Sequence, residues 1–283
     1  MKKVLLILLF AISFQISKSQ SLSRERVAKI KSATVRITIE GTNSVGSGFF
    51  INNQGLVATC FHVIKPAIQA NGRFNKIFVE LNTGEIIEYG IITRIATDTN
   101  WAKNAISFDY CLLAPVKPSG FRTFPFLKLG NFDDANEGDE IYTCGYPIGI
   151  KQQFLTEGII STKYIEDSNR VYFNNRTFFA PRDQALLDIT LNRGNSGGAI
   201  IKIGTTINDD EVIGIADFII TPAGSQSEQM IDLLLSASGN IRLSGVDPNY
   251  VFAQIFSIIS SLSIGVSGCI SINHLVSWLA HNN

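Results

Sequence analysis

The chain has 283 residues, with 24 basic and 24 acidic side chains and three histidines. Without its first 19 residues, which hold three of the lysines, it has 264 residues and a formal charge of −3. Such a charge excludes binding to nucleic acid or an anionic membrane through a general basic surface. The length allows one large domain or two small ones with a sizeable core.

Residues 1–19 have the three-part composition of a secretory signal peptide. Two lysines precede the apolar run Val4–Phe14, and small residues follow it before Gln20. The run is short for a membrane span, and no later stretch reaches the roughly 20 apolar residues that a membrane helix needs. We expect an exported, periplasmic or extracellular, soluble protein that begins near Gln20. An uncleaved N-terminal anchor is the alternative.

After a short helix expected at residues 23–33, brief β-branched and aromatic runs follow one another, separated by glycine, asparagine and aspartate. Many short strands without intervening helices indicate antiparallel barrels or sandwiches rather than a parallel α/β sheet. The fold class is therefore all-β. The expected strands lie within residues 34–40, 46–52, 56–64, 76–81, 85–95, 110–116, 140–147, 157–165, 170–175, 197–203 and 211–220.

The stretch "APVKPSGFRTFPF" at residues 114–126 holds three of the eight prolines and separates the strands into two sets. We therefore divide the chain into an N-terminal half, residues 20–120, and a C-terminal half, residues 121–283.

The C-terminal half contains a segment of different character at residues 221–261, where "EQMIDLLLS" and "DPNYVFAQIFSIISSL" suit helices. The apolar run in the second helix is expected to pack on its own barrel, with an oligomer interface as the alternative. The last residues, "GCISINHLVSWLAHNN", predict one strand and a terminal helix.

The cysteines and the remaining histidines give no sign of a metal site or a cofactor. Export permits disulfides, and four cysteines allow three pairings, but no C-x-x-C pair is present. Each cysteine lies in an apolar, strand-like run, so buried free thiols are expected. We expect no metal and no cofactor; the residues concerned are Cys60, Cys111, Cys144, Cys269, His274 and His281.

Three residues have the surroundings that acyl transfer at a serine requires. Ser196 lies in "LNRGNSGG", His62 follows an apolar strand in "LVATCFHVI", and Asp109 opens another in "SFDYCLLAP". Such chemistry needs a nucleophile, a base and an acid that orients the base, together with amide donors for the oxyanion. The chain order His–Asp–Ser is that of the chymotrypsin-type double barrel and differs from the order in subtilisins and α/β-hydrolases.

With these motifs, the sequence resembles the trypsin-like serine proteases and, within them, the HtrA/Deg branch. "GSGFFINNQGLVATCFHVI" is similar to the family's entry into the histidine loop, and "LNRGNSGGAI" to its nucleophile segment. The resemblance covers most of Val35 to Leu279 apart from two insertions. It implies a chymotrypsin-like double β-barrel with a helical insertion and a C-terminal helix. Because four residues follow Leu279, we expect no PDZ domain of the kind that this branch usually carries.

The resemblance also implies a role for each residue of the site. His62 would be the general base and then the general acid, Asp109 its orienting group and Ser196 the nucleophile. The backbone N–H groups of Gly194 and Ser196 would form the oxyanion hole. Many relatives carry an aspartate before the serine that pairs with a newly formed N-terminus; Asn195 here has no charge for that pairing.

The expected primary pocket includes Thr190, Asn192 and Phe218. Relatives that cleave after Lys or Arg carry an aspartate where this chain has Thr190, and burying a cation without a counter-charge is costly. The resemblance therefore implies cleavage of protein or peptide substrates after small or medium apolar residues.

Several alternatives stay open. Asp98 lies in a longer stretch before Asp109 and could orient His62 in its place. Asp217 falls where relatives carry a small hydroxyl residue, so it either approaches the triad aspartate or faces outward from its strand. The double barrel could also have lost turnover and act as a peptide-binding or protein-binding module. An oligomer is possible but not indicated by the sequence.

Overall fold

The computed structural model describes most of the chain, in ten ranges. These are residues 22–69, 71–93, 108–117, 120, 122–173, 176–219, 227–239, 242–243, 245–259 and 265–282. At residues 165–173, 176–182, 218, 219, 227, 228, 258, 259 and 282 it describes the backbone alone. The expected signal peptide and Asp98 lie outside the described residues.

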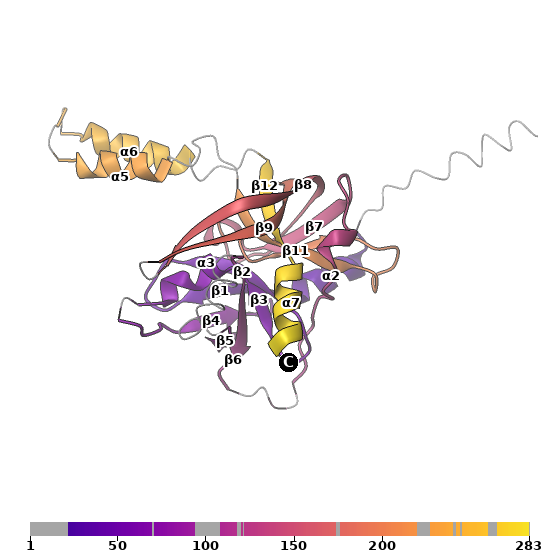
Figure 1. Cartoon of the computed structure of the whole chain (residues 1–283). Coiled ribbons are helices and arrows are strands. Elements are labelled where there is room, and N and C mark those ends of the chain that lie inside the picture. The colour runs from indigo at the N-terminus through magenta and orange to yellow at the C-terminus, as the bar shows by residue number, and fades with distance from the viewer. Residues whose placement is uncertain are drawn as a thin grey trace, which may run out of the picture.

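The chain folds into two closed antiparallel β-barrels, which confirms the predicted all-β, chymotrypsin-like double barrel (Figure 1). The order of strands around the first barrel is β1-β2-β3-β6-β5-β4, and around the second β10-β11-β12-β9-β8-β7. The first barrel consists of β1 (Thr34–Ile39), β2 (Val45–Phe50), β3 (Val57–Thr59), β4 (Ile77–Glu80), β5 (Ile86–Ile91) and β6 (Cys111–Pro115). The second consists of β7 (Glu140–Gly145), β8 (Phe154–Phe173), β9 (Arg176–Asp188), β10 (Ala199–Lys202), β11 (Glu211–Ile219) and β12 (Val266–Ser271).

Alternation of side chains gives each barrel an apolar interior. In β1, Val35, Ile37 and Ile39 are buried, while Arg36 and Thr38 between them are partly exposed. This period of two places every second residue inside the barrel. Clustered buried side chains fill both barrels, and the larger cluster continues from the first barrel across to the second.

Two terminal helices connect the barrels. The lead helix α2 (Arg24–Ala33) begins at the N-cap Ser23, and its Arg26 forms an ion pair of 3.2 Å with the buried Asp210 before β11. The C-terminal helix α7 (Asn273–Asn282) follows β12 of the second barrel, and its buried Leu275 belongs to the cluster that fills the first. Each helix therefore holds residues of one half against the other.

Two local predictions were wrong in the first barrel and in the ribbon β8–β9. The expected strand at residues 56–64 ends at Thr59, and a helical turn α3 (Phe61–Ile64) follows it. The expected strand at 170–175 is the far end of the long β8, and its partner β9 was missed altogether. Pairing of β9 with both β8 and β12 overrides the weak strand preference of its charged residues and Pro181.

The free-thiol prediction is confirmed: Cys60, Cys111, Cys144 and Cys269 are all buried and unpaired with one another. Burial raises the pKa of the Cys111 thiol to about 12, and it raises that of Cys144 to about 11. Both thiols stay protonated at neutral pH and behave as small apolar side chains.

The insertion forms the predicted helices, α5 (Ser227–Ser236) and α6 (Pro248–Ile259). Asp247 caps α6 by accepting a hydrogen bond from the backbone N–H of Tyr250, as the Asp-Pro start predicted. The two helices lie against each other and project away from the barrels (Figure 1). No described helix is both long and apolar enough to cross a membrane.

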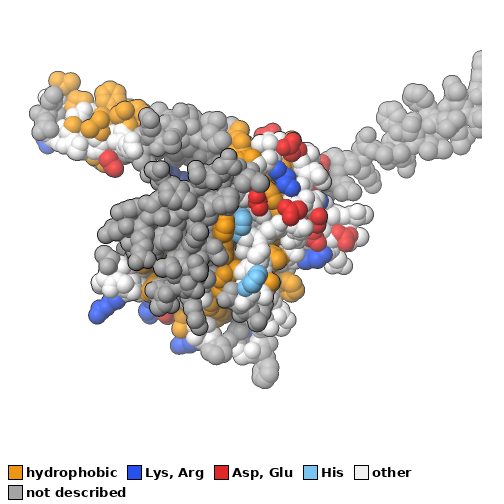
Figure 2. All heavy atoms as spheres, viewed as in Figure 1, with side chains coloured by type: hydrophobic (Ala, Val, Ile, Leu, Met, Phe, Trp, Pro, Cys, Tyr) orange, Lys and Arg blue, Asp and Glu red, His pale blue; other side chains and the backbone are white. Residues whose placement is uncertain are grey.

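The expectation that the second helix packs on its own barrel was wrong. Helix α6 buries Ala253 but leaves Tyr250, Phe252 and Ile255 exposed, and Leu233 of α5 is exposed as well. Figure 2 shows these apolar side chains gathered on the projecting hairpin. Most contacts of each helix are with the other helix. The apolar residues therefore lie on a two-helix arm and do not face a barrel.

We therefore expect the barrels to fold without this arm. Replacing residues 227–259 by a short Gly-Ser linker should change the thermal midpoint by less than about 3 °C, because roughly 1 kcal/mol shifts it by 2–4 °C in a chain of this size. Binding of an apolar dye should fall, since exposed apolar area is removed. Calorimetry of the shortened and full chains checks the first outcome. A fall of more than about 10 °C would show that the arm packs on the barrels.

Candidate active site

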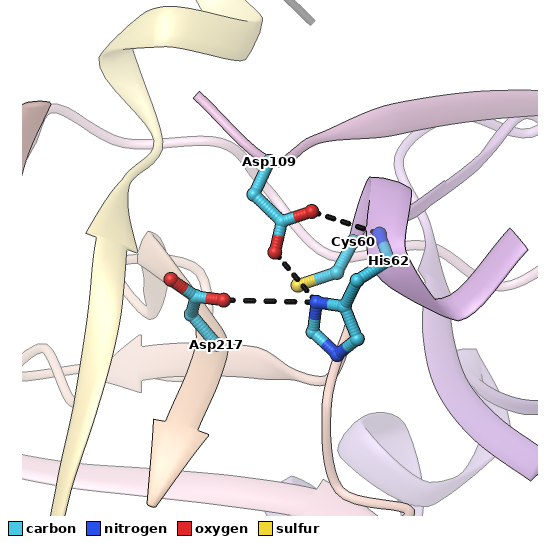
Figure 3. Close-up of side chains that lie close together, drawn as sticks. All are labelled: Cys60, His62, Asp109 and Asp217. Carbon is cyan, nitrogen blue, oxygen red and sulfur yellow. Dashed lines mark hydrogen bonds and ion pairs between the residues drawn. The ribbon is translucent and has the colours of Figure 1, made fainter. Parts of the chain in front are cut away.

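His62 and Asp109 of the first barrel contact each other at two points. The His62 ring Nδ1 lies 2.6 Å from Oδ2 of Asp109, and the His62 backbone N–H donates to Oδ1 at 2.8 Å (Figure 3). A carboxylate only accepts hydrogen bonds, so Nδ1 carries a proton. When the ring is neutral, Nε2 therefore holds the lone pair, and when the ring takes up a second proton, its positive charge lies beside Asp109. The ring is oriented as a general base requires.

Burial differs sharply between the two partners. The His62 side chain is 44% exposed, whereas that of Asp109 is 12% exposed. Burial by itself would raise the pKa of Asp109, but the charge of His62 and hydrogen bonds from His62 and Asp217 outweigh it and leave the pKa below its ordinary value. Asp109 is therefore an anion beneath an imidazole that reaches solvent.

The local backbone explains how Asp109 reaches this place. Its φ of 49° lies in the left-handed region, which short polar residues tolerate better than others. The carbonyl of Asp109 also accepts from the backbone N–H of Phe61 at the start of α3. Asp109 thus joins the turn before β6 to the helical turn after β3 through both Phe61 and His62.

Ser196 lies in the turn between β9 and β10, and both barrels hold this turn. The backbone N–H of Ser47 in β2 donates to the carbonyl of Ser196 at 2.9 Å. The hydroxyl of Ser196 donates to the backbone carbonyl of Asp217 at 3.3 Å. In this arrangement the Ser196 hydroxyl bonds to β11, and its proton must turn from the Asp217 carbonyl to reach His62.

Two glycines in the turn have no room for a side chain. Gly194 has a φ of 101°, and a Cβ there would lie 2.3 Å from the carbonyl oxygen of Tyr146. Gly197 has a φ of 86°, and its Cβ would meet the Ser47 carbonyl and the Thr59 hydroxyl at 2.2 Å. Glycine is therefore required by both backbone angle and space.

The hydrogen bonds of two carbonyl groups in the turn fix the orientation of the peptide planes that carry the N–H groups of Gly194 and Ser196. The Arg193 carbonyl accepts from the N–H of Ile148 at 2.6 Å, and the Asn195 carbonyl accepts from that of Gly198 at 2.9 Å. In a trans peptide the N–H points opposite the carbonyl, so those of Gly194 and Ser196 point away from these bonds. Neither N–H has a protein acceptor among the described residues. Both N–H groups therefore stay available as donors, as the expected oxyanion hole requires.

Comparisons with known proteins identify the family to which the chain belongs. The trypsin-like peptidase domain model matches residues 46–215, which include His62, Asp109 and Ser196. The chain belongs to the trypsin-like peptidase family. A solved structure of the HtrA-type protease AlgW with a tripeptide aligns with a TM-score of 0.56 and 20% identity, covering 90% of this chain and 61% of that one.

Curated relatives of this family member are longer proteins. The probable periplasmic serine endoprotease DegP-like of Rickettsia conorii is 30% identical over 185 residues, covering 64% of this chain and 30% of the relative. The serine protease HTRA3 of Rattus norvegicus is 30% identical over 172 residues, covering 61% and 32%. This chain spans about a third of the length of the curated relatives that it matches.

The residues expected in the primary pocket are only partly described. Thr190 is exposed just after β9, and Asn192 is half-buried in the nucleophile turn. The backbone of Phe218 pairs with Gly268 in the sheet, but its side chain lies outside the described residues. Asn195, which replaces the family's N-terminus-pairing aspartate, is buried. Thr190 therefore adds no charge where basic-specific relatives have a carboxylate.

Sequence reasoning missed the supporting role of Ser47. Its hydroxyl donates to the Gly194 carbonyl at 2.6 Å and accepts from the backbone N–H of Tyr146 at 3.0 Å. Ser47 is fully buried, and through it β2 of the first barrel fixes the turn that carries the expected oxyanion donors. A serine in the strand "VGSGFF" was the available signal, because a buried hydroxyl needs partners.

Asp217 in β11 was left undecided by the sequence, and its side chain faces the triad. Its Oδ1 lies 3.7 Å from Nδ1 of His62, and its side chain is 9% exposed (Figure 3). The outward-facing alternative is therefore wrong. Asp217 joins Cys60, His62 and Asp109 in a cluster whose ligand-type atoms all lie within 4.8 Å of one another.

Proposed function

We propose that this chain is an exported serine endopeptidase that hydrolyses peptide bonds through His62, Asp109 and Ser196. The main support is the two-point contact between His62 and Asp109, which puts a proton on Nδ1 and so makes Nε2 the basic nitrogen of the neutral ring. A chance contact of a surface histidine would not be expected to involve two hydrogen bonds, one from its backbone and one from its ring. Nor would it be expected to involve a buried aspartate in the left-handed backbone conformation.

The proposed reaction follows from these positions. The Ser196 hydroxyl turns from the Asp217 carbonyl to His62, which takes its proton at Nε2 while Oγ attacks the substrate carbonyl carbon. The N–H groups of Gly194 and Ser196 stabilise the oxyanion. His62 then gives the proton to the leaving amine, and an acyl-enzyme ester remains. Water attacks this ester by the same steps, releasing the acid and restoring the Ser196 hydroxyl.

Substrate preference and compartment are part of the same proposal. Thr190 offers no counter-charge for Lys or Arg, which favours small or medium apolar side chains before the cleaved bond. The relatives named above as periplasmic endoproteases, together with the composition of residues 1–19, favour export. The substrates would be proteins or peptides.

One observation favours the alternative of a binding module without turnover: the Ser196 hydroxyl donates to Asp217 and not to His62 in this structure. Labelling with a fluorophosphonate probe distinguishes the two functions, because the probe reacts with a serine that a base has activated. The wild type should be labelled, Ser196→Ala should not, and the exposed Ser236→Ala should behave as the wild type.

The result that would overturn the proposal is an unlabelled wild type whose folding is verified by circular dichroism. Labelling that persists in Ser196→Ala would also overturn it, because another nucleophile would then be responsible. A digest of a peptide library by the labelled protein would then report the residue preferred before the cleaved bond.

A further inference from the structure

Asp217 reaches the triad through an irregularity in its strand. Ala216 pairs with Cys269 of β12 and Phe218 pairs with Gly268, so Asp217 is an extra residue between consecutive pairs. A β-bulge of this kind redirects the side chain that it carries. Figure 3 shows the Asp217 carboxyl pointing from β11 toward the Asp109 carboxyl and the His62 ring.

The two carboxyl groups are too close together and too deeply buried for both to be ionised. Carboxyl oxygens of Asp217 and Asp109 lie within 4.8 Å of each other, and the two side chains are 9% and 12% exposed. A hydrogen bond between two carboxyl groups requires a proton on one of them. Two like charges at such a distance in a low-dielectric site repel strongly, so one group keeps its proton at neutral pH.

The remaining contacts decide which carboxyl holds this proton. Asp109 accepts from the backbone N–H and the ring N–H of His62, and both bonds favour its ionised form. Asp217 lies farther from the ring, at 3.7 Å from Nδ1. Asp109 is therefore the anion, and Asp217 is the carboxyl group that keeps its proton and can donate it in a hydrogen bond to Asp109.

A bound metal ion would be another way to join these groups, because Cys60 and His62 complete a possible ligand set with the two carboxyls. The distances favour a proton. Ligands of one tetrahedral zinc ion lie about 3.3 Å apart when each is about 2.0 Å from the metal. Nδ1 of His62 and Oδ2 of Asp109 are 2.6 Å apart, and the Cys60 thiol donates to the Ala216 carbonyl.

We propose that Asp217 is a carboxylic acid at neutral pH and a positioning residue, which holds Asp109 against His62 by donating a hydrogen bond. This inference rests on the proposed function, since it assigns a role in the same site. A carboxyl group in this position offers what a hydroxyl would offer, a donor to Asp109, but it can also lose its proton.

The charged and titratable groups around Asp217 come from three elements. Asp109 precedes β6, His62 and Cys60 lie in and before α3, and Cys269 lies on β12. Burial raises the pKa of Cys269 to about 12, so this thiol stays neutral. Asp109 is then the group that opposes ionisation of Asp217, and His62 the group that favours it.

Ionisation of Asp217 at higher pH would replace the hydrogen bond by repulsion between two carboxylates. Asp109 would then move from its position on His62, and kcat/KM should fall on the alkaline side. Asp217→Asn keeps an N–H donor of the same shape but cannot ionise. Asp217→Ala removes the donor altogether.

The experiment compares pH profiles of kcat/KM for the wild type, both Asp217 variants and the exposed control Asp232→Asn. We expect Asp217→Asn to stay within about threefold of the wild type at pH 7 and to lack the alkaline decline. Asp217→Ala should lose at least tenfold at every pH, while Asp232→Asn should follow the wild type. An alkaline decline that persists in Asp217→Asn overturns the proposal, and so does an Asp217→Ala variant of full activity.

A spectroscopic measurement keeps this test separate from the proposed function. The infrared C=O band of a protonated carboxylic acid should be present in the wild type at pH 7, also with Ser196→Ala as background, and absent in Asp217→Asn. If the fluorophosphonate probe fails to label the wild type, the proposed protease fails, yet this band still reports the protonation of Asp217. A spectrum without such a band, or a band unchanged by Asp217→Asn, overturns the assignment.

Discussion

Asp109→Asn is expected to lower kcat by about 10⁴-fold, the loss found when the aspartate of a Ser-His-Asp triad becomes an amide. The reason lies in the two bonds that Asp109 makes. Its Oδ1 accepts from the His62 backbone N–H and its Oδ2 from the ring Nδ1–H. An asparagine has one acceptor and one donor, so whichever way it turns, one of the two His62 donors faces an N–H.

If the amide oxygen keeps the backbone bond, its NH₂ group faces Nδ1. The ring then carries its proton on Nε2, and the base has no lone pair for Ser196. The fold should survive, because asparagine tolerates the left-handed conformation that Asp109 adopts, with its φ of 49°. Alanine at this position would add backbone strain to the chemical effect.

Single-turnover kinetics with an activated ester and a thermal melt together check this prediction. The control is Asp232→Asn, the same chemical change on the exposed face of the projecting arm. A loss of less than tenfold with an unchanged melt would mean that another carboxylate orients His62. Asp217 is the described candidate, and Asp98 is the candidate that the sequence offered.

The double barrel could be predicted because its determinants are local. Alternating apolar residues in β1 and the glycine-rich turn around Ser196 are visible in short windows of sequence. The helices of the insertion were predictable for the same reason, since the Asp-Pro start of α6 is a local capping signal. Periodicity and capping act over a few residues, so a single sequence records them.

What escaped prediction depends on contacts between distant residues. Strand β9 carries charges and a proline, and only its pairing with β8 and β12 makes it a strand. The Ser47 hydroxyl donates a hydrogen bond to the carbonyl of Gly194, which lies 147 positions later in the sequence. A pattern within a short window of sequence does not show such a contact. The direction of the arm formed by α5 and α6 likewise depends on how the chain leaves β11, and hydrophobicity alone predicted burial on a barrel.

The contact of Asp217 with His62 was only partly predictable from the sequence. Alignment placed this residue on a strand beside the groove, and strand alternation decides between inward and outward only if the register is regular. The bulge between Ala216 and Phe218 changes that register by one residue. A sequence does not show where an extra residue enters a strand. The presence of a charged residue on this strand could therefore be predicted, but the direction of its side chain could not.

Gly194→Ala is expected to lower kcat by about 10²–10³-fold or more, the loss found when one oxyanion donor is removed. A Cβ on residue 194 would lie 2.3 Å from the Tyr146 carbonyl oxygen, which is backbone and has little freedom to move. The Arg193–Gly194 peptide must therefore rotate or shift. Its N–H would then leave the side of the turn to which that of Ser196 also points.

The matched control is Gly138→Ala in the turn before β7. Gly138 has a φ of 89°, close to the 101° of Gly194, but a Cβ there would meet no atom within 4 Å. Both variants carry the cost of a side chain at positive φ, roughly 1–2 kcal/mol. Urea unfolding should show that cost in Gly138→Ala, whereas its kcat should equal that of the wild type. Turnover by folded Gly194→Ala within threefold of the wild type would show that the Gly194 N–H does not bind the oxyanion.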